Sequence, residues 1–595
     1  MDQIDNTKKT TKLAWPGRAA ALRRLALIAA VLFPCTWIVT ALLIRDWNLL
    51  GDRNAEAFRH LREAATVFVA VVCIVFLLSM LPTVQRLFRC LFNRRVVRRT
   101  LIALAWMVTA VALFYGEQNW HGRRAWNKYS EALAQQGEEL DFKAFIPRAV
   151  PEAENFAAAP EIQSWFIRHT NKDGSGIEYH WNTDIYAQAK IKQSSEPDRM
   201  PHRMTDLVAW QRAFEAIAAG RTSELREDFN SDQFDWESRT KAAPAILNAL
   251  KPMDERFDEL RAAASRPQSR YPVVYNLENP WGILLPHLSD IRSVCVRLQL
   301  RACAELAAGK TDQALGDVKL ILRMSDSLNE EPFLISYLVR IQAFHIATQS
   351  IWEGLAERRW SDAQLKELQG LLEQYDFIAD MKRPLDGERD AGILTADLLG
   401  RGKYRLNDLT SDSDSSGSEF MGLMPRGWYD LEKLNYCRLF DLQLKGAFQT
   451  NDKRVFPHQV EANSTALQQA LSRANRFTRH QLLAALLLPS LGNVPPKSAL
   501  AQTVAEEALI ACGLERYRLA HGQFPDALDA LSPDFISRLP HDVISGAAYK
   551  YRRIGGQFVL YSVGWNETDD GGQVTTKGTS GVPLTGDWVW QYPMP

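Results

Sequence analysis

Three apolar runs near the N-terminus constrain this chain more than any other feature of its sequence. Residues 25–44 form a run of twenty without a charged side chain, long enough to cross a hydrocarbon core about 30 Å thick as a helix. A second run covers 64–81 and a third covers 100–115. We therefore predict three transmembrane helices within residues 1–116. The alternative for the first run is a cleaved signal peptide, but twenty apolar residues exceed a typical signal core and no small-residue cleavage site follows.

The distribution of basic residues predicts how these helices are oriented, because Lys and Arg close to helix ends are retained in the cytoplasm. Two segments are rich in them, one before the first run and one after the second: Lys8, Lys9, Lys12, Arg18, Arg23, Arg24, Arg86, Arg89, Arg94, Arg95, Arg98 and Arg99. We predict a multi-pass protein of the inner, cytoplasmic membrane, with a cytoplasmic N-terminus. Everything beyond Tyr115 then lies on the far side, as a periplasmic or extracellular domain.

The remainder of the chain shows mainly helical periodicity, so the predicted fold class is mainly α. Helices are expected at 120–136, 205–219, 244–264, 333–357 and 361–375. Residues 288–328 resemble one tetratricopeptide-like hairpin, in which Gly309 makes a tight turn and Thr311 caps the returning helix, but no period of about 34 residues follows. The predicted organisation is a membrane anchor at 1–116, helical exported regions at 117–287, 288–409 and 426–497, a Ser- and Asp-rich linker at 410–425, and an α+β module at 498–595.

Charge and cysteine content exclude several functional classes. Lys+Arg and Asp+Glu both number 70, so no net field favours nucleic acid as a partner. The seven cysteines form no C-x-x-C pair, which argues against zinc and thioredoxin-like sites. Four of them fall in the predicted exported domain: Cys295, Cys303, Cys437 and Cys512. The first two are too far apart along a helix to pair with each other, which leaves buried thiols or a disulfide through one of the others.

Linear catalytic motifs are also missing, and we assign no catalytic or cofactor-binding residue. The sequence lacks H-E-x-x-H, G-x-S-x-G, a Walker loop and a dinucleotide fingerprint. Adjacent acids such as Glu330 and Glu331 would suit a glycosidase if their carboxylates lay about 5 to 9 Å apart across a substrate. Two hypotheses follow. One is a non-catalytic binding or scaffolding domain with a protein partner in the envelope; the other is a hydrolase of cell-wall glycan or peptide.

The last fifth of the chain changes pattern. A helix ending at Gly522 is followed by a predicted β-hairpin, in which Gly555 and Gly556 turn between two β-rich segments. This part resembles the C-terminal domain of type II secretion major pseudopilins. The resemblance is carried by LERYRLAHGQFP (514–525), YKYR (549–552), YSVG (561–564), DDGG (569–572) and the terminal Asp587-Trp588. The prepilin-peptidase site and the full hydrophobic stem of that family are missing, so pilus assembly is not implied.

The resemblance implies a calcium site. Asp569, Asp570 and Asp587 match acidic positions near the calcium site of major pseudopilins, and calcium takes oxygen ligands from carboxylates and carbonyls; the alternative is a solvated hairpin loop. The whole chain is also similar to a group of uncharacterised bacterial envelope proteins that share the RRAW (123–126) and FIP (145–147) segments. That similarity implies an envelope location and no particular activity.

Overall fold

The computed structural model describes residues 94–404 and 424–592, except 168, 171–176, 179–184, 191–202, 222–228, 232–234, 473–478, 575–577 and 580–581. Within these ranges the chain is mainly helical, as predicted. It divides into two compact units, Met1–Ala112 and Leu113–Pro595. The predicted spans at 25–44 and 64–81 and almost all of the predicted linker at 410–425 lie outside the described residues.

The third predicted span belongs to a much longer helix, α4 (Arg94–Gln135). Among the described residues, α4 contains the one helix that is long and apolar enough to cross a membrane, and its apolar stretch is not buried. Leu113 and Trp106 are 69% and 71% exposed. The separate amphipathic helix expected at 120–136 is the second half of α4. No proline or glycine turn separates the two halves, so the helix continues past the apolar stretch.

The first part of the large unit is built from short helices. Asp235 caps the N-terminus of α8 by accepting from the backbone N–H groups of Glu237 and Ser238. The single helix predicted at 244–264 is therefore wrong in its bounds: one helix begins earlier, contains Pro244 and ends at Leu250, and a second helix covers Asp254–Ala263. The elements here are η3 (Phe142–Phe145), η4 (Glu152–Glu154), η5 (Phe156–Ala158), α5 (Pro160–Ser164), β1 (His169–Thr170), β2 (Ile177–Glu178), α6 (Ile185–Lys190), β3 (Met204–Thr205), α7 (Leu207–Ala218), β4 (Asn230–Ser231), α8 (Trp236–Leu250), η7 (Lys251–Met253), α9 (Asp254–Ala263) and η8 (Pro280–Gly282).

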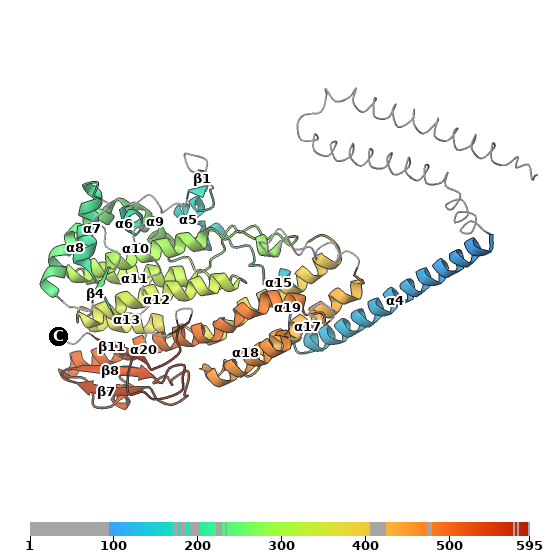
Figure 1. The fold of residues 1–595 in the computed structure, drawn as a ribbon. Coiled ribbons are helices and arrows are strands. Elements are labelled where there is room, and N and C mark those ends of the chain that lie inside the picture. The colour runs from blue at the N-terminus through green and yellow to red at the C-terminus, as the bar shows by residue number, and fades with distance from the viewer. Residues whose placement is uncertain are drawn as a thin grey trace, which may run out of the picture. The chain divides into compact units, whose positions relative to one another are not determined.

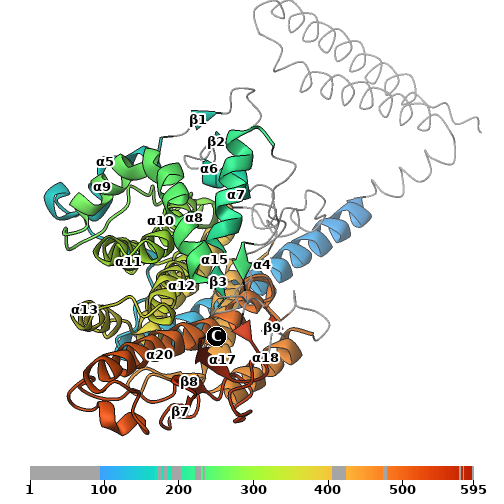
Figure 2. The same cartoon turned by 90° about the vertical axis from the view of Figure 1, so that its left-hand side faces the viewer.

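The predicted hairpin is confirmed and is extended by two more helices. It consists of α10 (His287–Ala307) and α11 (Thr311–Asp326), joined at Gly309, whose φ is +73°. Helices α12 (Leu334–Ala356) and α13 (Asp362–Leu372) follow, and the views in Figures 1 and 2 show α10, α11 and α12 side by side. The predicted cap was wrong in detail. Thr311 is the first helical residue, and its hydroxyl accepts from Gln364 Nε2 on α13 at 3.1 Å.

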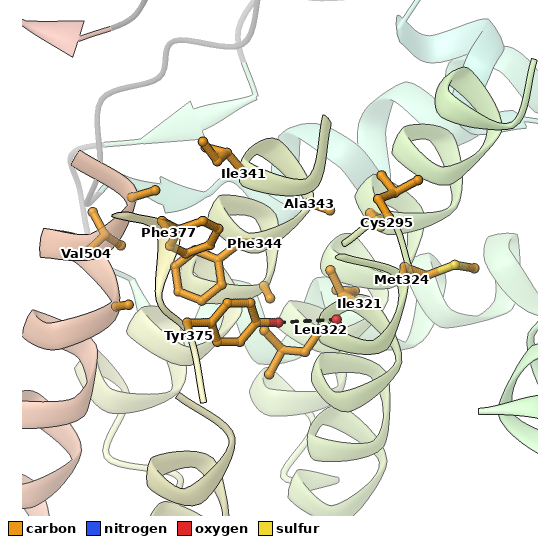
Figure 3. Close-up of a cluster of buried hydrophobic side chains, with 14 of the residues drawn as sticks. Cys295, Ile321, Leu322, Met324, Ile341, Ala343, Phe344, Tyr375, Phe377 and Val504 are labelled. Carbon is orange, nitrogen blue, oxygen red and sulfur yellow. Dashed lines mark hydrogen bonds between the residues drawn. The ribbon is translucent and has the colours of Figure 1, made fainter. Parts of the chain in front are cut away.

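An aromatic cluster fills the core between these helices and the C-terminal part (Figure 3). The ring centroid of Phe344 on α12 lies 4.6 Å from that of Tyr375 and 4.9 Å from that of Phe377. The Tyr375 hydroxyl donates to the Leu322 carbonyl on α11 at 3.3 Å. Val504 of the long helix α20 (Val494–His521) lies on the other side of the cluster. Aromatic side chains of this size bury large areas and fix the spacing of the helices around them.

The remaining helices complete the large unit. They are α14 (Phe377–Asp380), α15 (Lys382–Gly400), α17 (Arg426–Leu444), α18 (Pro457–Ser472), α19 (Leu482–Leu487), η10 (Leu488–Asn493), α20 and η11 (Leu528–Leu531), with β5 (Phe448–Gln449) and β6 (Arg454–Val455) between α17 and α18. Helix α20 packs on α12, α13 and α14, and is buried on all sides for most of its length. The boundary predicted at 498 therefore falls inside a helix that belongs to the helical core.

A small antiparallel sheet covers the outer side of α20 (Figure 1). The predicted hairpin is confirmed as β7 (Lys550–Ile554) and β8 (Gln557–Ser562), with Lys550 opposite Tyr561 and both glycines of the turn at positive φ. A third strand, β11 (Trp588–Gln591), pairs with the other edge of β8. Strands β9 (Gly578–Thr579) and β10 (Val582–Pro583) form a separate two-stranded ribbon. The expected arrangement of a helix packed on a small sheet is thus present.

Candidate functional site

The second half of α4 crosses α17 at two glycines that bring the backbones into direct contact. A Cβ atom on Gly122 would lie 2.0 Å from the Gly427 carbonyl oxygen, and one on Gly427 would lie 2.2 Å from the Gln118 carbonyl oxygen. Backbone atoms cannot swing aside as a long side chain can. Only glycine fits at both positions, as at close crossings of membrane helices.

Polar side chains of α4 complete the N-terminus of α17. The first backbone N–H groups of a helix have no partner within it, and Pro425 before α17 offers no side-chain cap. Instead, Asn119 Oδ1 accepts from the Gly427 N–H at 2.8 Å, and Gln118 Oε1 accepts from the Trp428 indole at 2.8 Å. The cap of α17 is therefore supplied by a helix that lies some 300 residues earlier in the chain.

Further contacts extend the junction in both directions. At its N-terminal end, the Phe114 and Trp428 rings meet edge to face with centroids 6.4 Å apart. At its C-terminal end, the Tyr129 hydroxyl donates to Asp441 Oδ2 at 2.6 Å, and burial followed by this bond raises the pKa of Tyr129. Between them, the Lys433 ammonium lies 4.6 Å from the Trp126 ring centroid. The helix that carries the apolar stretch is thus held along several turns of α17.

Buried ionisable groups form a second type of site. Arg239 on α8 lies 2.7 Å from Glu353 Oε2 and 2.9 Å from Glu357 Oε1. Glu353 is in the last turn of α12, and Glu357 directly follows that helix. Thr205 donates its backbone N–H and its hydroxyl to Glu353 Oε1, at 2.9 and 2.6 Å, and accepts from Arg239 through its carbonyl. Burial and the Glu353 charge raise the pKa of Glu357 to about 7, against the opposing effect of Arg239. This cluster ties α8, β3 and α12 together.

A similar cluster joins α9, α10 and α11. The fully buried Asp317 accepts from Arg301 Nε and Nη2, each at 2.7 Å, and from Arg261. Glu305 lies 3.8 Å from the same guanidinium, and burial followed by the Asp317 charge raises its pKa to about 8. A bidentate arginine fixes its carboxylate in both distance and orientation. These ion pairs therefore hold α9, α10 and α11 in fixed positions relative to one another.

The adjacent acids Glu330 and Glu331 occupy different environments. Glu331 is buried, with Oε1 2.8 Å from Nε2 of the fully buried His287 and Oε2 accepting from Ser336. Neither Glu331 Oε1 nor His287 Nε2 makes a hydrogen bond. Glu330 is 64% exposed and lies 3.6 Å from Arg383. The two carboxylates therefore do not face each other across a common space, as a glycosidase pair must.

The three predicted calcium ligands come from two neighbouring segments, the loop after β8 and the residue before β11, and each has internal partners. Asp587 Oδ1 accepts from the Asp570 N–H at 3.2 Å, and its Oδ2 accepts from the Gly572 N–H at 2.6 Å. Asp569 lies 3.2 Å from the Lys550 ammonium and accepts from Tyr561 and Gly571. Among the described residues, no group of three or more His, Cys, Asp or Glu side chains is arranged to hold a metal ion. Calcium would have to displace the ammonium and several N–H donors, so the present arrangement does not fit the ion.

The four cysteines in the large unit are buried free thiols, and Cys303 lies beside polar groups, with its sulfur accepting from Gln299 Nε2 at 3.5 Å. Burial raises the pKa of the Cys295, Cys437 and Cys512 thiols. Thiolates are the reactive form of cysteine, so these groups are poor nucleophiles. The alternative of a disulfide among them is wrong.

Comparison with known proteins adds no family: no protein-family model, curated protein or solved structure matches this chain. The resemblance to pseudopilins and to bacterial envelope proteins stays a prediction.

The sequence analysis predicts neither the α4–α17 junction nor the buried ion clusters. A glycine followed by tryptophan after Pro425 is a weak signal for a helix start, and Gly122 lies in an otherwise ordinary helical segment. Nothing in a single sequence joins residues some 300 positions apart. The clusters likewise pair residues more than 100 positions apart, such as Arg239 with Glu353.

Proposed function

We propose that this chain is a membrane-anchored binding or scaffolding protein of the bacterial cell envelope, without catalytic activity of its own. One observation carries the proposal. The exposed apolar stretch of α4 continues without a break into a helix that is docked on α17 through Gly122 and Gly427. A helix that only filled the core of a soluble protein would bury its apolar stretch, whereas this stretch is exposed.

The orientation proposed from the basic residues is compatible with this helix. Arg94, Arg95, Arg98 and Arg99 precede its apolar stretch, and we place them on the cytoplasmic side. The large unit is then periplasmic or extracellular. The additional spans proposed at 25–44 and 64–81 make the protein multi-pass.

The non-catalytic role is supported by the environment of the acidic groups. Glu353, Asp317 and Glu331 lie between packed helices and contact arginine, histidine or hydroxyl groups. Acid–base catalysis requires contact with a substrate. Hairpins such as α10 and α11 are surfaces on which partner helices or peptides commonly bind. Two exposed apolar residues, Val274 and Ile335 (81% and 52% exposed), lie within two positions in sequence of Tyr275 and Phe333, whose rings stack on each other.

Two experiments test the proposal. The anchored topology requires that the full-length protein stay in the membrane after alkaline carbonate extraction and that alkaline phosphatase fused after Pro595 be active. Release by carbonate, or an inactive fusion together with an active cytoplasmic reporter, would contradict it. The binding role is tested by a photoreactive amino acid at Val274 or Ile335 in cells, with exposed Lys366 as the control position. A discrete crosslinked protein at the first two positions and none at the third is expected, whereas equal labelling at all three argues against a specific partner.

A further inference from the structure

Aromatic and basic residues from both halves of the junction follow the end of the apolar stretch of α4, where Phe114 meets Trp428. We call this set the collar: Trp120 and Arg124 on α4, Arg426 and Trp428 at the start of α17, and Arg479 before α19. Trp120 is 62% exposed and the three arginines are exposed. Arg479 enters the set through its neighbour His480, whose ring centroid lies 5.1 Å from that of Trp428.

The collar lies at the depth of a membrane interface if the apolar stretch spans the bilayer. Trp120 follows Tyr115 by five residues, or about 8 Å along the helix axis, and the interfacial layer on each side of the hydrocarbon core is about 5 to 8 Å thick. Trp428 lies at the level of Phe114, because their rings are in contact. Tryptophan is enriched at this depth, since its ring is apolar and its N–H is polar.

Of the three arginines, Arg124 is directed toward the same layer. Side chains of an α-helix tilt toward its N-terminus, which for α4 is the direction of the apolar stretch. Arg124 shows this tilt, with its guanidinium 5.3 Å from the Trp120 ring centroid, one turn earlier. The Arg479 carbonyl accepts from Asn435 Nδ2 at 2.9 Å, which fixes the backbone that carries this arginine beside α17. The collar contains three arginines and no acidic residue. The nearest acidic residue on this stretch of α4 is Glu117, whose carboxylate accepts from Gln118. The collar and its surroundings therefore carry an excess of positive charge.

From this placement we infer that the collar binds the headgroups of anionic phospholipids in the leaflet next to the large unit. Phosphate groups accept the fork of N–H donors that a guanidinium offers, and the tryptophans fill the boundary between headgroups and acyl chains. The inference rests on the proposed membrane anchoring and adds a lipid preference to it. It assigns to the junction a second role, which is to seat the large unit on the bilayer surface.

The test uses the full-length protein in nanodiscs with equal amounts of phosphatidylcholine and phosphatidylglycerol. After transfer to a mild detergent, the lipids that stay bound are counted by native mass spectrometry. The collar variant carries Arg124→Gln, Arg426→Gln and Arg479→Gln. The control variant removes the same charge from exposed positions elsewhere in the large unit, with Lys366→Gln, Arg538→Gln and Arg552→Gln.

We expect phosphatidylglycerol to be enriched over phosphatidylcholine on the wild type and on the control variant. The enrichment should fall roughly fivefold for each collar arginine removed, since a basic residue close to an anionic surface contributes about 1 kcal/mol. Equal retention of the two lipids on the wild type, or an equal loss in the control variant, would overturn the inference. Release of the protein by alkaline carbonate would instead contradict the membrane anchor, so the two failures are distinguishable.

Discussion

Replacing Gly427 by alanine is the most direct test of the junction between α4 and α17. The new Cβ would lie 2.2 Å from the Gln118 carbonyl oxygen and 2.6 Å from Asn119 Cα, whereas ordinary contact begins near 3.4 Å. Both neighbours are backbone atoms, so the two helices must part by about 1 Å, a shift of the kind that overpacking produces.

The magnitude follows from the contacts that this shift disturbs. Overpacking with backbone movement costs about 1 to 3 kcal/mol. The bonds from Gly427 to Asn119 and from Trp428 to Gln118 contribute about 1 kcal/mol each when intact. We therefore expect Gly427→Ala to lower the free energy of unfolding by about 2 to 4 kcal/mol, depending on how far these bonds lengthen.

Gly316→Ala is the matched control. Gly316 lies in the middle of α11, and a Cβ there would have no neighbour within 4 Å. Alanine is favoured over glycine inside a helix by about 1 kcal/mol, so this variant should be more stable than the wild type. The assay is thermal unfolding in detergent, together with amide hydrogen exchange of the peptides that cover α17. Gly427→Ala should speed exchange at the start of α17, and a variant with wild-type stability and wild-type exchange there would refute the close crossing.

Three further predictions concern the buried charges and the acidic loop. Arg239→Met leaves Glu353 and Glu357 buried without their guanidinium and should cost about 3 to 5 kcal/mol in denaturant unfolding, whereas Lys241→Met, at a 71% exposed position, should change it by less than about 0.5 kcal/mol. Burial raises the pKa of Glu506 from 4.5 to about 7. Between these two pH values the folded chain keeps a proton that the unfolded chain has lost. The contribution of this group to the free energy of unfolding therefore falls as pH rises from 4.5 to about 7. Glu506→Gln should flatten that part of the pH profile, and an unchanged profile would assign the effect elsewhere. Because the Lys550 ammonium and backbone N–H groups already contact these carboxylates, we expect millimolar calcium to leave the melting temperature unchanged. Bound calcium at 100 times its dissociation constant would add about 2.7 kcal/mol to stability, so a shift in melting temperature that Asp570→Ala abolishes would instead support the calcium site.

Periodicity in the sequence predicts several of the helices and the β-hairpin. The helix predicted at 333–357 corresponds to α12, and the turn at Gly555 and Gly556 joins β7 to β8. These elements depend on neighbours within a few residues, through apolar spacing, capping and glycine turns. Such local patterns carry no information about which helices pack together.

Boundaries and distant contacts were harder to predict. The sequence suggested that a helix begins at Pro244, but Asp235 provides the cap and the helix starts at Trp236, eight residues before the proline. The change of pattern near Ser498 suggested a separate module, yet α20 begins at Val494 and is buried between the helical core and the sheet. The sites that we regard as functional depend on pairs such as Gly122 and Gly427, which only the folded chain brings together.

The position of α20 also bears on how this protein is made. The aromatic rings of Phe344, Tyr375 and Phe377 are covered on one side by α20, which is synthesised after more than four-fifths of the chain. Until that helix emerges, the earlier helices expose an apolar surface of the kind that chaperones and proteases recognise. A chain that stops before residue 494 would keep this surface, so premature termination should lead to degradation of the whole helical unit. In this way α20 would distinguish chains that have been synthesised beyond residue 521 from chains that stopped earlier.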